Sequence, residues 1–549
     1  MKKRLERLLQ HALLKGIEGG ALKSKSLPPL LFEVPKERAF GDLATTVALG
    51  MARQERSAPQ AIAQRIVEHI EDPDGFLAAT EIAGPGYINF RFSPRFWAEC
   101  LADLERDDFR PAAFGEGKRV LVEFVSANPT GPLTVGHGRN AALGDAIARL
   151  LDATGHRVTR EYYFNNAGRQ MMLLGQSVKA RYLERLGEPE GFPEDGYRGE
   201  YIVAIAGNLA LEDADQLRLE PPTGRFKQAA EDAIFDDIKR TLARLDISFD
   251  SYFNEDSLYT SGQIAAVLEE LRARDLAFDR DGAVWLRGEP LGLDKDRVLV
   301  KSSGEPAYRL PDIAYHKDKL RRGFDLLIDV LGADHIAEHE DVRVALRALG
   351  YNVDIIKPVI YQFVTLTRAG VQVKMSTRRA EYVTVDELTD EVGRDVVRFF
   401  FLTRKADSHL EFDLDLAKKQ SADNPVFYVQ YAHARVCSLI RQAERADVRP
   451  TAAADAHLET LGAPEELAVV KLLAQYTDTV EDAARTLEPH RVVFYLIDLA
   501  SEFHRFYNRH RVLTDDPAQT AARLYLACAV GQVIKNGLGL VGVSAPESM

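Results

Sequence analysis

Apolar positions near the start of the chain recur at helical spacing and then switch to strict alternation. The helical pattern rests on Leu5, Leu8, Leu9 and Leu13, which together indicate an amphipathic first helix. In residues 87–92 the apolar side chains Ile88, Phe90 and Phe92 alternate with Tyr87, Asn89 and Arg91, and this pattern predicts a half-buried strand. We therefore expect a small α+β domain over residues 1–110, with Tyr87 and Asn89 on the outward face of the strand.

The middle of the chain begins with a strand that is apolar on both faces. Residues 120–125 form a nearly continuous apolar run, which is typical of a parallel strand covered by helices on both sides. A loop rich in glycine, proline, asparagine and threonine follows at 127–136, and a helix is predicted from about His137 to Leu151. The next strand (157–164) and helix (166–186) complete a strand–helix–strand unit of Rossmann type.

We expect this parallel-sheet fold to occupy residues 111–420, with an insertion inside it. Residues 187–290 are charged and irregular before they become helical, with hairpin-like segments at 276–287, and we assign them to the insertion. The fold is predicted to resume with a strand at 324–331, a helix at about 335–349 and a strand at 359–366. Beyond residue 384 helical patterns dominate, including 425–445, 465–486, 489–511 and 518–537, so residues 421–549 should form an all-helical bundle.

Composition is that of an ordinary folded protein. Hydrophobic residues make up 46% and charged residues 28% of the chain, and no apolar run approaches the ~18 residues of a membrane span. The basic N-terminus lacks the apolar core of a signal peptide. Cys100, Cys437 and Cys528 are odd in number and far apart, which argues against disulfides and against a cysteine-based metal site. We expect a cytoplasmic monomer without a structural metal.

The net charge is the one bulk property that disfavours a nucleic-acid partner. It is −13 at pH 7, whereas binding to phosphates requires positive potential. A nucleic acid senses only the face that it touches, so this sum neither establishes nor excludes RNA binding.

Two loops carry the residues of a candidate nucleotide site. In the first, Thr134, Gly136 and His137 lie where a strand gives way to a helix, and the free N–H groups of a helix start suit a phosphate. A purely structural histidine at a helix start is the alternative. The second loop follows a core strand and contains Lys374, Met375, Ser376, Arg378 and Arg379. Its cations can stabilise a departing pyrophosphate or simply face solvent.

Acidic residues at two further positions indicate a cationic ligand. Glu123 interrupts an otherwise apolar strand, and a buried carboxylate requires a cation or a raised pKa. A guanidinium offers it paired, planar donors, although a salt bridge to an arginine of the chain would also satisfy it. Pro311 suits the first position of a helix, which would place Asp312 in the first turn. Helix-dipole stabilisation alone is the alternative for Asp312.

Taken together, the two loops resemble the paired ATP-binding motifs of class I aminoacyl-tRNA synthetases. The acidic segments are similar to those of the arginyl enzymes, and the resemblance implies that arginine is held by Glu123, Ser126, Asn128, Tyr308 and Asp312. It implies that ATP is bound by Thr134, Gly136, His137, Asp334, His335, Lys374, Met375 and Ser376. His137, Lys374, Arg378 and Arg379 are the implied catalytic residues.

The two ends of the chain resemble the same family. Residues 83–90 are similar to its N-terminal domain, which implies that Tyr87 and Asn89 contact tRNA. Tyr428, Tyr431 and Arg435 lie three and four residues apart on one helix face, and they resemble the start of its anticodon-binding domain. Buried core tyrosines are the alternative. Residues 504–511 interleave cations with aromatic side chains, which suits contact with phosphates and bases.

The chain departs from the family pattern at two places. The usual leading histidine of the first motif is Thr134, and the usual second lysine of the second motif is Thr377. Some arginyl enzymes place a compensating lysine before the first motif, but Gly131 stands there. We therefore predict that Arg378 or Arg379 supplies part of the missing charge.

The resemblance implies an arginine–tRNA ligase that uses ATP, with Mg²⁺, to form arginyl-adenylate. The arginine is then transferred to the 3′-terminal ribose of tRNA(Arg), releasing AMP and pyrophosphate, and activation is expected to require bound tRNA. Another class I synthetase is one alternative, which the pairing of Glu123 with Asp312 disfavours. A synthetase-like protein that binds tRNA without ligating is the second.

Overall fold

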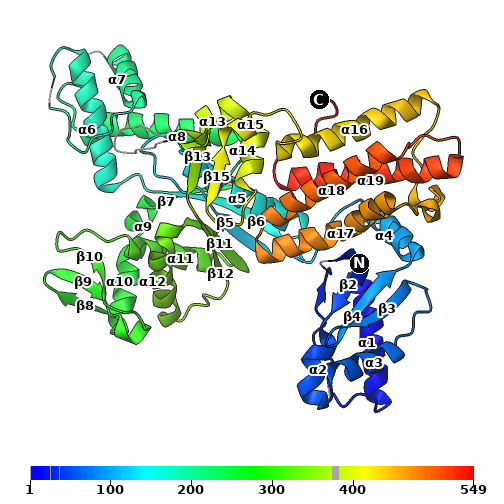
Figure 1. Cartoon of the computed structure of the whole chain (residues 1–549). Coiled ribbons are helices and arrows are strands. Elements are labelled where there is room, and N and C mark those ends of the chain that lie inside the picture. The colour runs from blue at the N-terminus through cyan, green and yellow to red at the C-terminus, as the bar shows by residue number, and fades with distance from the viewer. Residues whose placement is uncertain (1, 25, 36, 190, 214, 374–382) are drawn as a thin grey trace.

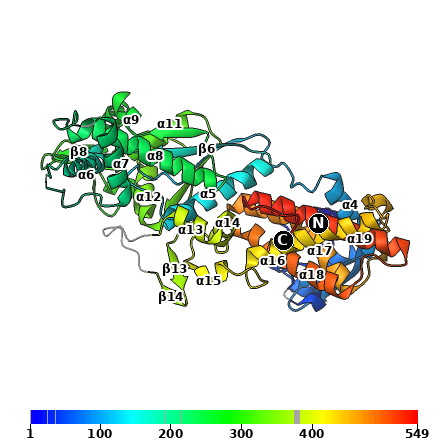
Figure 2. The same ribbon diagram turned by 90° about the horizontal axis from the view of Figure 1, so that it is seen from above.

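The computed structural model describes residues 2–373 and 383–549, apart from residues 25, 36, 190 and 214. Its helices and strands gather into an N-terminal unit, a central unit built on a parallel sheet, and a C-terminal helical bundle (Figure 1). The view from above shows an elongated molecule in which the N-terminal unit lies against the bundle (Figure 2). The expected fold class is confirmed.

The N-terminal unit packs helices on a four-stranded antiparallel sheet. Its elements are α1 (Lys2–Glu18), β1 (Phe32–Glu33), η1 (Arg38–Phe40), β2 (Leu43–Thr45), α2 (Val47–Glu55), α3 (Pro59–Glu68), β3 (Leu77–Ala83), β4 (Tyr87–Phe92) and α4 (Pro94–Arg106). The strand order is β1-β2-β4-β3. The predicted first helix and the strand at 87–92 are confirmed, and Leu5, Leu9 and Leu13 are fully buried. The sequence did not indicate β1, β2 and β3.

The central unit contains a five-stranded, all-parallel sheet of order β12-β11-β5-β6-β7. The strands are β5 (Arg119–Glu123), β6 (Arg157–Phe164), β7 (Ser251–Asn254), β11 (Leu326–Gly332) and β12 (Ile356–Tyr361). In chain order the first and fourth strands lie side by side, so the strand order reverses between β5 and β11. Ligands of such sheets bind at this reversal, beyond the carboxyl ends of the strands.

Helices cover both faces of this sheet. On one face α5 (Val135–Ala153) packs on Val120, Val122, Ile328 and Val330, and on the other α11 (Arg309–Arg321) packs on Leu121 and Leu327. The approach of α5 requires Gly144, because a Cβ there would lie 2.2 Å from the Phe124 ring. The ring therefore fills the space that a larger side chain would occupy.

The remaining elements of the central unit surround this sheet. They are α6 (Gly168–Arg185), α7 (Glu200–Glu212), η2 (Pro222–Phe226), α8 (Lys227–Arg244), α9 (Asp256–Thr260), α10 (Gln263–Ala273), β8 (Ala277–Arg280), β9 (Ala283–Leu286), η3 (Glu289–Leu291), β10 (Arg297–Val300), η4 (Ala333–His335), α12 (Ile336–Ala348), β13 (Val364–Arg368), β14 (Val371–Gln372), α13 (Val385–Val392), α14 (Arg394–Phe401), β15 (Leu410–Asp413) and α15 (Leu414–Ala417).

Two sequence expectations for this unit are wrong. Strand β7 lies within 187–290 yet pairs with β6 in the main sheet, so that range is not a single insertion. The strand expected at 359–366 is two strands, because the chain leaves the main sheet after Tyr361 and β13 pairs with β14 and β15 instead. Both differences arise because strand partners are set by tertiary contact rather than by local pattern.

The C-terminal bundle follows the predicted helices closely. It consists of α16 (Pro425–Arg445), η6 (Ala453–Asp455), η7 (Leu458–Thr460), α17 (Pro464–Thr486), α18 (His490–Arg509) and α19 (Pro517–Leu540). Its interior is apolar and includes Leu473, Val480, Leu496, Phe503 and Ile534. Within the described ranges, no helix combines the length and the apolar character needed to cross a membrane.

Candidate active site

The first candidate ATP loop forms the start of helix α5. Thr134 is the residue before the helix, and its backbone N–H donates to His137 Nδ1 at 3.1 Å. Because Nδ1 is the acceptor, the proton of the neutral ring is on Nε2. Burial lowers the pKa of His137, which favours this neutral form. His137 can therefore present an N–H donor to a phosphate oxygen without carrying a charge.

Gly136 leaves open space at the same helix start. Among the described residues, a Cβ at this position would meet only Thr134 Oγ1, at 3.9 Å. The packing of these residues therefore does not require glycine here. Uncovered backbone beside free helix N–H groups is suited to the close approach of a nucleotide.

The second candidate ATP loop lies outside the described residues. This loop contains Lys374, Met375, Ser376, Thr377, Arg378 and Arg379. The residues that flank this loop are described. Thr384 forms an isolated β-bridge with Thr134, and Val385 N–H donates to the carbonyl of Leu133 at 2.8 Å. One end of the second loop is thus fixed beside the first loop.

Asp334 and His335 directly follow β11 at the carboxyl edge of the sheet, which is also the edge where the first loop lies. They lie in η4, their side chains are 64% and 58% exposed, and Asp334 Oδ2 is 3.6 Å from His335 Nε2. Their exposure at the carboxyl end of β11 leaves both free to contact a ligand at the strand-order reversal.

Glu123 is the last residue of β5 and is only 8% exposed. One carboxylate oxygen accepts a hydrogen bond from Ser126 Oγ at 2.9 Å, and the other contacts Lys319 Nζ. The structural ion pair considered as an alternative is therefore present, but with a lysine rather than an arginine. The contact with Ser126 agrees with the expectation that these two residues share a site.

The backbone after Glu123 is strained. Val125 and Ser126 have φ angles of 66° and 44°, which non-glycine residues seldom adopt. The strained turn is held by Asn140 of α5, whose side chain accepts from Val125 N–H at 2.7 Å and donates to the carbonyl of Val330 at 2.9 Å. Strain maintained in this way is typical of functional sites, and here it turns Ser126 back toward Glu123.

Asp312 lies in the first turn of α11, as expected, but Pro311 is the third helical residue rather than the first. No side chain in the described part of the chain forms a hydrogen bond or ion pair with its carboxylate. Burial raises the pKa of Asp312 well above its usual value, and the negative charges of Glu338, Glu255 and Glu123 raise it further. The ammonium of Lys319 opposes this rise, but it contacts Glu123 and Asp329 rather than Asp312.

Glu255 is an acidic residue near Asp312 that the sequence did not indicate. It follows β7, is 6% exposed, and accepts hydrogen bonds from Tyr163, from Asn165 at 2.7 Å and from Tyr259 at 3.3 Å. Burial raises its pKa. It was missed because β7 was assigned to an insertion.

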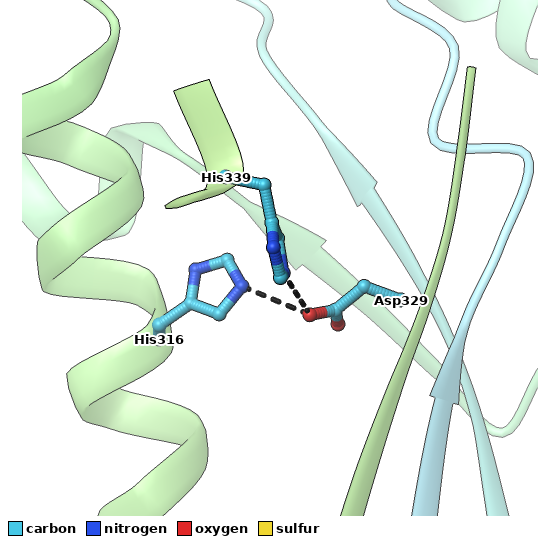
Figure 3. Close-up of side chains that lie close together, drawn as sticks. All are labelled: His316, Asp329 and His339. Atoms are coloured by element: carbon cyan, nitrogen blue, oxygen red, sulfur yellow. Dashed lines mark hydrogen bonds and ion pairs between the residues drawn. The ribbon is translucent and has the colours of Figure 1, made fainter. Parts of the chain in front are cut away.

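A second missed group lies beside Glu123 on the neighbouring strand. Asp329 of β11 is fully buried and binds Lys319 Nζ at 2.7 Å. The rings of His316 and His339 both point at its other oxygen, with Nε2 atoms at 3.1 and 3.0 Å (Figure 3). Burial would raise the pKa of Asp329, but Lys319 and His316 hold it well below its usual value. Asp329 interrupts an apolar strand just as Glu123 does, and that signal could have identified it.

Two other predicted arginine ligands lie at the edges of this site. Asn128 donates to Gln170 Oε1 at 3.1 Å and accepts from the backbone N–H of Asn165 at 3.0 Å, so it fixes the loop. Tyr308 immediately precedes α11 and is 70% exposed. Its phenol is free to move onto a ligand.

The predicted RNA-binding residues of the bundle form one cluster with His504 of α18. The guanidinium of Arg435 lies 4.8 Å from the centre of the Tyr431 ring, and the rings of Tyr431 and Tyr428 are 5.6 and 4.6 Å from that of His504. Tyr431 is 39% exposed. The cluster therefore presents an aromatic and cationic surface rather than a wholly buried core.

One expectation for the N-terminal unit requires correction. Asn89 was expected on an outward face, but it is only 6% exposed, because β4 lies between β2 and β3 in the middle of the sheet. Tyr87, at the start of β4, is partly exposed.

Comparison with known proteins identifies all three units. The model "tRNA synthetases class I (R), catalytic domain" matches residues 102–406, "Arginyl tRNA synthetase N terminal domain" matches 3–92, and "DALR anticodon binding domain" matches 429–549. Proteins named arginine–tRNA ligase from Desulfotalea psychrophila and Desulfosudis oleivorans are 49% and 48% identical, with 100% of each chain covered.

A solved structure agrees with these matches. The arginyl-tRNA synthetase of Thermus thermophilus superposes with a TM-score of 0.76 at 25% identity, covering 98% of this chain and 100% of that one. The resemblance indicated by the sequence is thus confirmed, and the chain belongs to the arginyl-tRNA synthetase family within class I.

Proposed function

We propose that the chain ligates arginine to tRNA(Arg), with the acids at the strand-order reversal binding the guanidinium group. The observation that carries this proposal is the carboxylate of Asp312, which lies among Glu123, Glu255 and Glu338 and forms no ion pair with any described side chain. A guanidinium supplies the missing charge and paired donors. An uncharged amino acid would leave these carboxylates unpaired and is rejected for that reason.

Arginine is bound by Glu123, Asp312, Ser126, Asn128 and Tyr308 in this proposal. Glu123 and Asp312 take the guanidinium, and the short loop after β5 and the exposed ring of Tyr308 close around the rest of the amino acid. The contact of Ser126 with Glu123 and the fixed position of Asn128 support these assignments.

ATP lies across the start of α5 in this proposal. Thr134, Gly136 and His137 form one wall, and Asp334 and His335 lie at the end of β11. Lys374, Met375 and Ser376 form the opposite wall, while Arg378 and Arg379 supply charge to the departing pyrophosphate. The open backbone at Gly136, the neutral His137 donor and the anchoring of Thr384 beside Thr134 support this arrangement.

The reaction requires no nucleophile from the protein. The carboxylate of arginine attacks the α-phosphorus of ATP, which enters with Mg²⁺, and pyrophosphate leaves. The 2′-hydroxyl of the terminal tRNA ribose then attacks the carbonyl carbon of the adenylate, and AMP leaves. Catalysis is by positioning and by stabilisation of developing charge.

The tRNA contacts both ends of the chain in this proposal. Tyr428, Tyr431 and Arg435 bind the anticodon, and Tyr87 binds the body of the tRNA. We propose domains of 1–110, 111–420 and 421–549, which the ranges of the three family models support. We also propose that the chain is a cytoplasmic monomer, which size-exclusion chromatography with light scattering tests.

Charging assays test the central proposal. Purified protein incubated with total tRNA, ATP and each amino acid separately should esterify only arginine, and arginine-dependent ATP–pyrophosphate exchange should require tRNA. Charging of another amino acid would identify a different class I specificity. Binding of tRNA without esterification of any amino acid would identify a non-ligating relative.

A further inference from the structure

Three buried carboxylates stand side by side across the middle of the parallel sheet. Glu123 on β5 is paired in register with Asp329 on β11 and with Glu161 on β6. Asp329 and Glu161 are fully buried. Paired residues of neighbouring strands point to the same face at a spacing of about 4.8 Å, so three acids share the face that α11 covers. Buried acids require cations and hydrogen bonds.

Helix α11 divides this row into two units. Glu161 has partners of its own: Arg322 binds its two oxygens at 2.6 and 2.7 Å, and Tyr315 O–H donates to it at 2.7 Å. Glu123 and Asp329 instead share one ammonium, that of Lys319. This second unit therefore has two carboxylates for one ammonium, and its charge balance also depends on the histidines that face Asp329.

The two histidines determine where that negative charge lies. His316 and His339 both direct Nε2 at Asp329 (Figure 3), so Asp329 has three donors while Glu123 has only Lys319 and Ser126. The donors stabilise the ionised form of Asp329, which in turn binds Lys319. Glu123 is therefore held in place by an ammonium that it shares with the ionised Asp329.

The same helix face carries Asp312. It precedes His316 by one turn and Lys319 by two turns, and His316 Nδ1 donates to the carbonyl of Asp312 at 2.8 Å. Residues at this spacing line one side of a helix. Binding of Lys319 to the sheet therefore fixes how far α11 is shifted along the strands, and with it the position of Asp312 beside Glu123.

We propose that Asp329 is a positioning residue that determines specificity for a guanidinium: it holds Lys319 so that Glu123 stays oriented yet negatively charged beside Asp312. This inference rests on the proposed function, because it assumes that Glu123 and Asp312 receive the arginine side chain. Under this proposal, a buried residue that does not contact the substrate sets the charge balance around Glu123 and Asp312.

Two imidazoles and a carboxylate are also a ligand set for a divalent metal, and the three ligand atoms lie within 4.8 Å of one another. The ammonium of Lys319, 2.7 Å from the second oxygen of the same carboxylate, would repel such an ion. The ring nitrogens are already engaged in hydrogen bonds to Asp329. We therefore assign the cluster to hydrogen bonding and charge balance.

The test compares Asp329→Asn with a matched control, Glu161→Gln. Both changes neutralise one fully buried acid of the same row, but Glu161 forms its hydrogen bonds with Arg322 and Tyr315 rather than with Lys319. In Asp329→Asn, Glu123 is the one remaining carboxylate bound to Lys319, so the ammonium neutralises more of the negative charge of Glu123. The KM for arginine in tRNA-dependent pyrophosphate exchange should rise about tenfold or more, with the KM for ATP within twofold. Glu161→Gln should leave both KM values within twofold.

Citrulline, the uncharged analogue of arginine with a urea group in place of the guanidinium, separates charge from shape. The inhibition constant of citrulline should stay the same in Asp329→Asn while arginine weakens. Equal weakening of arginine and citrulline, or equal effects of the two variants on the KM for arginine, would show a merely structural role and overturn the proposal. One divalent metal ion per parent chain by elemental analysis, lost in Asp329→Asn, would overturn it as well.

A milder variant keeps the test decisive if Asp329→Asn does not fold. His339→Ala removes one donor from Asp329 and should raise the KM for arginine about threefold, and an unchanged value would refute the inference. Parent protein that does not use arginine at all would refute the proposed function instead. Parent protein that charges arginine, with variants that behave alike, would refute only this inference.

Discussion

Helices α5 and α11 cover opposite faces of one sheet with opposite chemistry. Beneath α5 the strands present Val120, Val122, Ile328 and Val330, and the helix meets them with small and aliphatic side chains. On the face under α11, the same two strands carry the acids Glu123 and Asp329. Lys319 of α11 binds both carboxylates. Each helix begins at the proposed reaction site, α5 with the candidate ATP loop and α11 with Asp312 in its first turn.

This difference separates the interactions that stabilise the fold from those that position the acidic side chains. Apolar burial is favourable but non-directional, so the face under α5 stabilises the fold and relies on Asn140 for alignment. Buried ion pairs often add little net stability because of desolvation, yet an incorrect arrangement of them is strongly unfavourable. The face under α11 therefore fixes the relative positions of Glu123 and Asp312 at a cost in stability.

The largest expected effect is on the α11 side of this comparison. Asp312→Asn should lower kcat/KM for arginine roughly a thousandfold, since it removes one member of a buried charge pair with the guanidinium. It should also raise the midpoint of thermal unfolding of the arginine-free protein, because the ionised carboxylate is unfavourable in the folded state. Asp318→Asn on the same helix is the control and should change kcat/KM only slightly. A loss of both activity and stability would contradict the comparison.

On the α5 side the loss should appear in catalysis rather than in arginine binding. His137→Ala removes a neutral donor from the phosphate site and should lower the rate of arginine activation by about a hundredfold or more. The KM for arginine should hardly change. Single-turnover formation of arginyl-adenylate with bound tRNA measures the rate. A variant affected mainly in the KM for arginine would show that the two helices do not divide the task.

The second ATP loop should contribute a similar amount. Arg378→Ala combined with Arg379→Ala should slow pyrophosphate exchange roughly a hundredfold, because the usual second lysine of this motif is Thr377. Adding Thr377→Lys to the double variant should restore much of the rate. A double variant within a few-fold of the parent would show that neither arginine has taken over the role of that lysine.

A smaller effect is expected from pH. The folded-state pKa of Asp312 is raised above its usual value of 3.8, so protonation begins at a higher pH than for an ordinary aspartate. As pH falls through that range the KM for arginine should rise several-fold, while the arginine-free chain gains the stability that it loses when pH rises through the same pKa. Both trends should disappear in Asp312→Asn. Kinetic and thermal-unfolding profiles recorded from neutral to mildly acidic pH test this.

The smallest effect on activity is expected in the apolar contact of α5. Ile147 is fully buried, and Ile147→Val should destabilise the fold by about 1 kcal/mol without changing the KM for arginine or ATP. Thermal unfolding and steady-state kinetics on one preparation give both values. A changed KM for arginine would mean that the apolar face also positions the substrate acids.

The spacing of apolar residues predicted the helices and strands whose boundaries depend on neighbouring residues. The helix expected at 425–445 is α16, and the strand expected at 157–164 is β6. Short strands such as β7 and β15 were missed, because their pairing partners are distant in sequence and their own patterns are weak. Glu123 was recognised because it interrupts an apolar strand. Asp329 shows the same interruption, but its role depends on Lys319, which no spacing rule connects to it.

The sequence by itself determined the sheet-and-bundle architecture, the family, and the two acids Glu123 and Asp312 as candidates for a guanidinium. Only the tertiary structure decided that Glu123 shares a lysine with Asp329, that Asp312 forms no ion pair with a described side chain, and that Glu255 lies near it. The physical reason is how far apart along the chain the interacting residues lie. Hydrophobic periodicity is a property of neighbouring residues, whereas the charge state and the partner of a buried acid depend on groups brought together from distant parts of the chain.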